Sequence, residues 1–152
     1  MQMADTVSVE TRSRNMAAIK GKNTVPEVYF RHLLFSRGLR YRLNVSGIPG
    51  HPDIYLAKYR TAVFVNGCFW HRHHNCRFAY TPKSNTNFWN AKFERNEQRD
   101  LEVRDQLEEK GYRQLVVWEC TLKKMKKDHD TENRIIDEVI CFLNSGEKNK
   151  EF

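Results

Sequence analysis

The chain is organised around ten consecutive residues, Gly67-Cys68-Phe69-Trp70-His71-Arg72-His73-His74-Asn75-Cys76. They place two thiols, three imidazoles and two large aromatic rings in one loop, and a third thiol, Cys120, follows the apolar run 115–118. Structural zinc takes four thiolate or imidazole ligands in a closed tetrahedral shell. We therefore predict a zinc site of Cys68, His73, Cys76 and Cys120. The alternative is a set of unligated intracellular thiols beside surface histidines.

Composition limits the class of protein. A length of 152 residues accommodates one domain with one core. The net charge of +7 and the 12% aromatic content favour a nucleic-acid partner, because phosphates attract cations and bases stack on rings. No stretch is long and apolar enough for a membrane span, and residues 1–10 lack a signal-peptide core. We expect a cytoplasmic protein without membrane association, in which cysteines bind metal rather than form disulfides.

Two β-rich runs, 52–56 and 61–65, precede the loop and are joined by a connection short enough for a hairpin. A turn centred between Lys58 and Tyr59 pairs residues whose numbers sum to about 117. Asp53 then lies opposite Phe64 or Val65, where the ten-residue loop begins. This register predicts that the carboxylate of Asp53 lies within reach of His71.

Two helices carry further acidic residues. The first begins with Thr24 as N-cap and Pro26 in its first turn and ends before Gly38, which places Glu27 beside an apolar face. The second runs from about 87 to 110 and places Asp100 on the face of Phe93 and Leu107, where an aspartate is unusual without a partner.

The remaining segments complete a single domain over 11–143, between a flexible tail at 1–10 and a charged tail at 144–152. We expect strands over 39–43 and 112–120, a Lys-rich loop over 122–127 and a last helix over 131–143, with Cys141 as a small buried thiol. A short basic helix over 11–20 with exposed Met16 and Ile19 either lies against DNA or is a solvated first helix.

Five motifs then identify a family. The most specific is Gly67-Cys68-Phe69-Trp70-His71, and the others match in the same order along roughly residues 11–143: Thr11–Met16, Pro49–Asp53, Asn87–Trp89 and Val117–Cys120. With these motifs the chain resembles the very short patch repair endonucleases. These are bacterial enzymes that nick DNA at thymine–guanine (T:G) mismatches left by deamination of 5-methylcytosine.

The resemblance implies an α/β, restriction-endonuclease-like fold, a central mixed sheet flanked by helices with a structural zinc site. It implies magnesium-dependent phosphodiester hydrolysis by a monomer on mismatched double-stranded DNA, functionally linked to a cytosine-5 methyltransferase. Asp53 matches the magnesium-binding aspartate, and His71 matches the histidine that acts as base or orients water. Glu27 and Asp100 match the acidic residues that support the site.

The resemblance also assigns the zinc ligands and the residues that enter the base stack. Cys68, His73, Cys76 and Cys120 match the family's zinc ligands. Phe69, Trp70 and Trp89 match the aromatic residues that the family inserts beside the mismatch. Met16 and Ile19 match apolar residues that enter from the minor groove.

Two departures from the family pattern affect the site. Val65-Asn66 stands where the family has a Thr-His pair. The backbone carbonyl of Val65 could still bind magnesium, because any residue supplies a carbonyl. Asn66, however, removes a histidine that could contact the cleaved phosphate. The loop also has one extra residue between Cys68 and Cys76, so either His73 or His74 is the fourth zinc ligand. Counting from Cys68 favours His73.

A second class of function is a zinc-stabilised DNA-binding module without catalysis. It accounts for the charge, the zinc loop and the aromatic rings. It leaves unexplained why Glu27, Asp53 and Asp100 gather near one loop of a basic protein, because carboxylates repel phosphates unless a cation lies between them.

Overall fold

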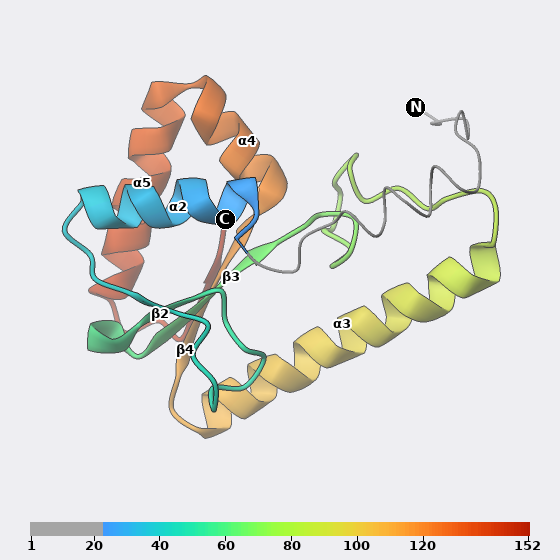
Figure 1. Ribbon diagram of the computed structural model, residues 1–152, viewed down its shortest axis with the longest axis horizontal. Coiled ribbons are helices and arrows are strands. Elements are labelled where there is room, and N and C mark those ends of the chain that lie inside the picture. The colour runs from blue at the N-terminus through green and yellow to red at the C-terminus, as the bar shows by residue number, and fades with distance from the viewer. Residues whose placement is uncertain (1–22) are drawn as a thin grey trace.

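Five strands form a mixed sheet in the order β1-β2-β3-β4-β5 in the computed structural model, which describes residues 23–152 (Figure 1). The strands β1, β2 and β3 pair antiparallel, and β3, β4 and β5 pair parallel. The strands are β1 (Arg42–Leu43), β2 (Ile54–Leu56), β3 (Thr61–Asn66), β4 (Arg113–Trp118) and β5 (Asn149–Glu151). The helices are α2 (Val25–Ser36), α3 (Thr86–Glu109), α4 (Glu119–Lys127) and α5 (His129–Leu143), with a short 3-10 turn η1 (Ala57–Tyr59).

Helices cover both faces of the sheet (Figure 1). The helices α2, α4 and α5 lie on one face, and the long helix α3 lies on the other. The first face packs a core that includes Val63, Leu115, Val117, Phe30 and Ile136. The second packs Ala62 and Phe64 against Leu107 and Val103 of α3. The expected α/β arrangement, a central mixed sheet flanked by helices, is therefore confirmed.

The hairpin register also agrees with the expectation. Ile54 pairs with Val63, Tyr55 with Ala62 and Leu56 with Thr61, so each pair of numbers sums to 117. The loop before the hairpin is held close to α3 at Gly50, where a Cβ would lie 2.5 Å from Val103 Cγ1 and where φ is +80°. Only glycine fits both constraints.

Both expected helices form, and the first has its predicted cap residues. The Thr24 side chain accepts a hydrogen bond from the Glu27 N–H at the start of α2, and Gly38 after the helix has a φ of 82°. Helix α3 runs from Thr86 to Glu109, and its buried residues are Trp89, Phe93 and Leu107.

Three expectations about residues 120–141 were wrong. Residues 122–127 belong to helix α4 rather than to a Lys-rich loop. Leu122 and Met125 are 1% exposed, and burial of each contributes about 1.5–3 kcal/mol, which outweighs the polar character of the surrounding lysines. Cys120, expected at the end of a strand, lies in the first turn of α4. Cys141 is exposed rather than buried, because it lies on the outer side of α5.

The segment expected as a charged tail, 144–152, contributes strand β5, which pairs with β4. The strand expected over 39–43 is limited to Arg42–Leu43. Within residues 23–152, no helix has the length and apolar character needed to cross a bilayer. The expected tail at 1–10 and the short helix over 11–20, with Met16 and Ile19, lie outside the described residues.

Candidate active site and metal centre

Asp53 lies at the mouth of the hairpin, as its register predicts. Its Oδ2 accepts a hydrogen bond of 2.8 Å from the backbone N–H of Val65. Burial raises the pKa of Asp53 to about 6, and the charge of Glu27 acts in the same direction. The Val65 N–H and His71 act against this shift. The carboxylate therefore sits in a partly desolvated place that favours a cation beside it.

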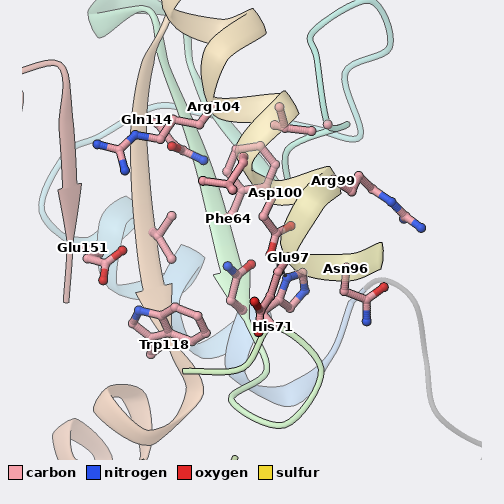
Figure 2. Close-up of a pocket in the computed structure, with 15 residues that line it drawn as sticks. Phe64, His71, Asn96, Glu97, Arg99, Asp100, Arg104, Gln114, Trp118 and Glu151 are labelled. Atoms are coloured by element: carbon pink, nitrogen blue, oxygen red, sulfur yellow. Dashed lines mark hydrogen bonds and ion pairs between the residues drawn. The ribbon is translucent and has the colours of Figure 1, made fainter. Parts of the chain in front are cut away.

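His71 is the second member of the site, and Asp100 of α3 is its partner. The His71 Nδ1 lies 2.7 Å from Asp100 Oδ2, and both side chains are partly exposed (Figure 2). An ionised carboxylate only accepts hydrogen bonds, so Nδ1 carries the proton and donates. The second ring nitrogen, Nε2, is then the basic one. This contact supplies the partner that the position of Asp100 required.

Glu27 is 6% exposed and approaches the same site from α2. Its Oε2 accepts a hydrogen bond of 2.8 Å from the Asn23 N–H, so the carboxylate also caps the start of the helix. Its charge contributes to the raised pKa of Asp53. Glu27 therefore both accepts a hydrogen bond at the start of α2 and adds negative charge near Asp53.

The predicted zinc ligands form one cluster. The ligand atoms of Cys68, His73, Cys76 and Cys120 all lie within 4.8 Å of one another. His73 Nδ1 lies 3.3 Å from the sulfur of Cys120 and 3.6 Å from that of Cys68. Three sulfurs and one imidazole nitrogen are a donor set that fits zinc. His73 rather than His74 belongs to this cluster, because His74 points to solvent.

The environment of His73 suits a metal ligand. The imidazole stacks on the Trp118 ring with a centroid distance of 4.1 Å and an angle of 8°. Burial lowers the pKa of His73, which keeps the ring in the neutral form that binds metal. Arg72 and Asn75 have φ of 54°. These left-handed residues on either side of His73 and His74 turn the loop so that His73 faces the three thiols.

Aromatic rings gather where the loop meets α3. The Phe69 ring lies 5.0 Å from Trp70, 5.5 Å from Trp89 and 5.2 Å from Phe93 between centroids. Phe69 and Trp70 are half-buried, whereas Trp89 is only 8% exposed. Trp89, expected among the rings that enter the base stack, therefore lies mainly inside this cluster.

Two further rings at the cluster have more free surface. Phe88 is 55% exposed and lies 5.3 Å from Trp89, and Tyr80 is 43% exposed and lies 5.1 Å from Phe69. The sequence reasoning did not single out either ring. The adjacent aromatic pair Phe88-Trp89 was the available signal, since neighbouring helix positions point about 100° apart and only one of the two rings can face the core.

Two polar residues that were not predicted as part of the site donate hydrogen bonds to the backbone of the loop. Asn96 donates a hydrogen bond of 3.0 Å from Nδ2 to the carbonyl of Trp70. Its spacing of seven from Trp89 and four from Asp100 places it on the same face of α3, which is a signal that could have identified it. The other residue is Arg72, which contacts the backbone on both sides of the loop.

A pocket of about 390 Å³ opens beside His71, between α3 and the sheet (Figure 2). Asp100, Glu97 and Asn96 line it from α3, and Asn66 and Trp118 line it from the ends of β3 and β4. Asn66 therefore places a side-chain amide at this space. The side chain of Asp53 is not part of the lining, so the pocket lies on the Asp100 side of the His71 ring.

Comparisons with known proteins agree with these features. A model of the family described as DNA mismatch endonuclease Vsr matches residues 4–77. The chain is 43% identical over 137 residues to Type II nicking enzyme V.NmeAIP of Neisseria meningitidis serogroup A, covering 90% of this chain and 97% of the relative. It is 40% identical over 142 residues to DNA mismatch endonuclease Vsr of Escherichia coli K12, covering 91% and 89%. A third relative, Type II nicking enzyme V.XorIIP of Xanthomonas oryzae, is 42% identical over 123 residues, covering 81% and 90%.

Proposed function

The chain belongs to the Vsr family of DNA mismatch endonucleases, and from this membership we propose that it nicks one DNA strand at T:G mismatches in a magnesium-dependent reaction. Its mixed sheet flanked by helices is the restriction-endonuclease-like fold of that family. The mismatches would be those that arise when 5-methylcytosine is deaminated to thymine.

One observation carries the proposal. A carboxylate with a raised pKa, Asp53, lies at the start of the loop whose His71 pairs with Asp100 at 2.7 Å. The same loop supplies three ligands of the Cys/His cluster. A DNA-binding module without chemistry has no need for a desolvated carboxylate or for a paired imidazole near it.

The chemistry of the donor atoms at Asp53 fits magnesium, which prefers oxygen ligands. The Asp53 carboxylate and the backbone carbonyl of Val65 would hold the ion, together with water and a phosphate oxygen of the DNA. When bound, magnesium stabilises charge on the cleaved phosphate and lowers the pKa of water. The Val65 N–H fixes the orientation of the Asp53 carboxylate, and Glu27 adds negative charge nearby.

His71 would take a proton from the attacking water at Nε2 or orient that water. The hydrogen bond from Nδ1 to Asp100 fixes the tautomer that leaves Nε2 able to accept. Asp100 also stabilises the imidazolium that forms when Nε2 takes the proton. Asp100 therefore acts through His71 rather than on the substrate.

The zinc site would be structural. Cys68, His73, Cys76 and Cys120 supply four ligands, which fill a tetrahedral shell and leave no position for substrate. These ligands join the loop to α4, so a bound zinc would fix the backbone on both sides of His71. Its contribution is to stability and to the position of the loop rather than to the chemical step.

Preference for a mismatch would come from aromatic rings at the surface of the loop. Phe69 and Trp70 would enter the base stack, with Trp89 beside them and Met16 and Ile19 entering from the minor groove. Separating stacked bases costs a few kcal/mol at a paired step and less at a mismatch. That difference favours insertion where pairing is already weak.

We further propose that the enzyme acts as a monomer and that its preferred flanking sequence follows that of a cytosine-5 methyltransferase. Deamination of the methylated base creates the mismatch, so the two enzymes need the same sequence context.

The test is cleavage of a panel of labelled duplexes, matched and with each single mismatch, with and without magnesium. We expect one nick, in the thymine-containing strand of the T:G duplex, only when magnesium is present. Tight binding to the T:G duplex without any nick would instead support the non-catalytic zinc module.

A further inference from the structure

We propose that Arg72 is a positioning residue, which holds the aromatic loop (residues 67–81) in the shape that presents Phe69 and Trp70 to the base stack. This inference rests on the proposed role of these two rings in mismatch recognition. It concerns a residue that lies between His71 and His73 and has no part in either the reaction or the metal cluster described above.

The guanidinium of Arg72 joins the two ends of the aromatic loop. Its Nη1 donates to the carbonyl of Phe69 at 3.4 Å and to that of Tyr80 at 2.9 Å. Its Nη2 donates to Oγ1 of Thr81 at 3.0 Å. A single side chain therefore links the residue that carries one of the rings to the segment where the loop returns toward α3.

The same guanidinium also fastens the loop to helix α3. It lies over the Phe93 ring, 3.9 Å from the centroid, and 6.0 Å from the centroid of Phe69. Phe93 is 4% exposed and packs against Trp89 and Phe69, so this contact has a rigid base. Burial lowers the pKa of Arg72, with Glu97 acting against the shift, which agrees with a guanidinium partly covered by the ring beneath it.

Other contacts already fix the rest of the loop. The Cys/His cluster holds Cys68, His73 and Cys76, and Asp100 holds His71. Phe69, Trp70, Tyr80 and Thr81 lie outside those anchors. In the described part of the chain, Arg72 donates hydrogen bonds to Phe69, Tyr80 and Thr81, whereas Asn96 and Lys92 contact Trp70. Loss of Arg72 should therefore loosen the aromatic rings and leave the metal cluster and His71 in place.

Lysine cannot replace arginine in this role. The contacts need a planar group that donates to three acceptors while its face stacks on a ring, whereas an ammonium is a compact charge without that fork. This difference separates the proposal from a simpler one, in which Arg72 is a positive charge that contacts a DNA phosphate. If charge alone matters, Arg72→Lys behaves like the wild type.

The experiment compares Arg72→Lys and Arg72→Met with the same two substitutions at Arg77. Arg77 is exposed in the same loop and lies over Phe78, 4.8 Å from its centroid. Each variant is assayed for zinc content, for affinity to T:G and matched duplexes, and for fluorescence of 2-aminopurine placed next to the mismatch. Hydrogen exchange of the Ala79 amide, which donates to the Cys76 carbonyl, reports the order of the loop without DNA.

We expect both Arg72 variants to keep zinc, to exchange the Ala79 amide faster and to lose about tenfold in preference for the mismatched duplex, because a disordered loop must be ordered on binding. The Arg77 variants should keep the preference. Wild-type preference and unchanged exchange in Arg72→Lys would overturn the proposal, even if Arg72→Met failed to fold. Trp70→Ala distinguishes the proposed role of the rings from the positioning of the loop by Arg72. If Trp70→Ala keeps full preference for the mismatched duplex while the Ala79 amide exchanges faster in the Arg72 variants, the rings do not recognise the mismatch but Arg72 still positions the loop.

Discussion

His71 Nδ1 lies 2.7 Å from Asp100 Oδ2, although the two residues are 29 positions apart in the chain. The contact joins the loop that follows β3 to the middle of α3. It sets which ring nitrogen carries the proton, and so leaves Nε2 as the nitrogen that can accept one in the proposed reaction.

His71→Ala should slow nicking by about 10²–10⁴, the usual contribution of a general acid or base. Asp100→Asn should cause a smaller loss, because an amide no longer stabilises the imidazolium. The measurement is single-turnover nicking of a T:G duplex at saturating enzyme. Asp105→Asn, an exposed change on the same helix, is the control. Both active-site variants should keep zinc, and wild-type rates in His71→Ala would place the base elsewhere.

Asp53→Asn should abolish nicking and leave DNA binding intact or tighter, because the variant loses both the proposed magnesium ligand and a carboxylate that repels phosphate. It should also stabilise the protein when no divalent cation is added. The pKa of about 6 in the folded protein exceeds the ordinary value of 3.8, so the folded state binds the proton more tightly than the unfolded chain.

The resulting destabilisation grows as pH rises from about 4 to 6 and is complete above that range, where it corresponds to about 3 kcal/mol. Urea unfolding at pH 8 should therefore show Asp53→Asn more stable than the wild type, with about half of that difference left at pH 5. A difference that does not change with pH would mean that the Asp53 carboxyl is not desolvated in the folded protein.

Removal of a zinc ligand should lower metal content and stability together. Cys76→Ser and Cys120→Ser should each lose zinc, because metal binding is coupled to folding. Each should lower the free energy of unfolding by more than the roughly 0.5 kcal/mol typical of a surface substitution. Cys141→Ser is the matched control, since Cys141 is exposed and outside the cluster. His73→Ala should lose zinc and His74→Ala should keep it, and the reverse result would exchange the two histidines. If metal analysis finds no zinc in well-folded wild-type protein, the assignment of the Cys/His cluster as a zinc site is wrong.

Trp89 should contribute mainly to protein stability, whereas Phe88 should contribute mainly to DNA binding. Trp89→Ala removes a ring that is 8% exposed and should lower stability by about 3–5 kcal/mol. Phe88→Ala removes a ring that is 55% exposed and should leave stability nearly unchanged. If bases stack on Phe88, the variant loses about 1–3 kcal/mol of binding to the T:G duplex. Thermal unfolding and duplex titration separate the two effects, and unchanged binding in Phe88→Ala would exclude this ring from the interface.

Local signals were enough to predict the hairpin, the two helices and the cysteine and histidine cluster. The pairing sum of 117 follows from the turn position alone. It places Asp53 opposite Phe64, next to Val65, whose N–H donates to the Asp53 carboxylate. The start of α2 follows from Thr24 and Pro26, whose effects depend only on adjacent residues. Asp100 was identified because a charge among apolar helix positions needs a partner.

The features that were missed depend on distant parts of the chain. Helix α4 has only two buried positions, Leu122 and Met125, and its lysines have the composition of a loop. Strand β5 forms because β4 offers it an edge, and its own residues Asn149–Glu151 are polar. The contacts of Arg72 with Tyr80 and Phe93 could not be predicted before the fold of the loop was known.

The parallel pairing of β4 with β5 has a consequence for synthesis on the ribosome. Residues 149–151 emerge after every other element of the sheet, so until then the apolar strand Leu115–Trp118 has an open edge. Such an edge is a template for pairing with another nascent chain. Pairing of the last strand therefore closes this edge of β4 to other nascent chains.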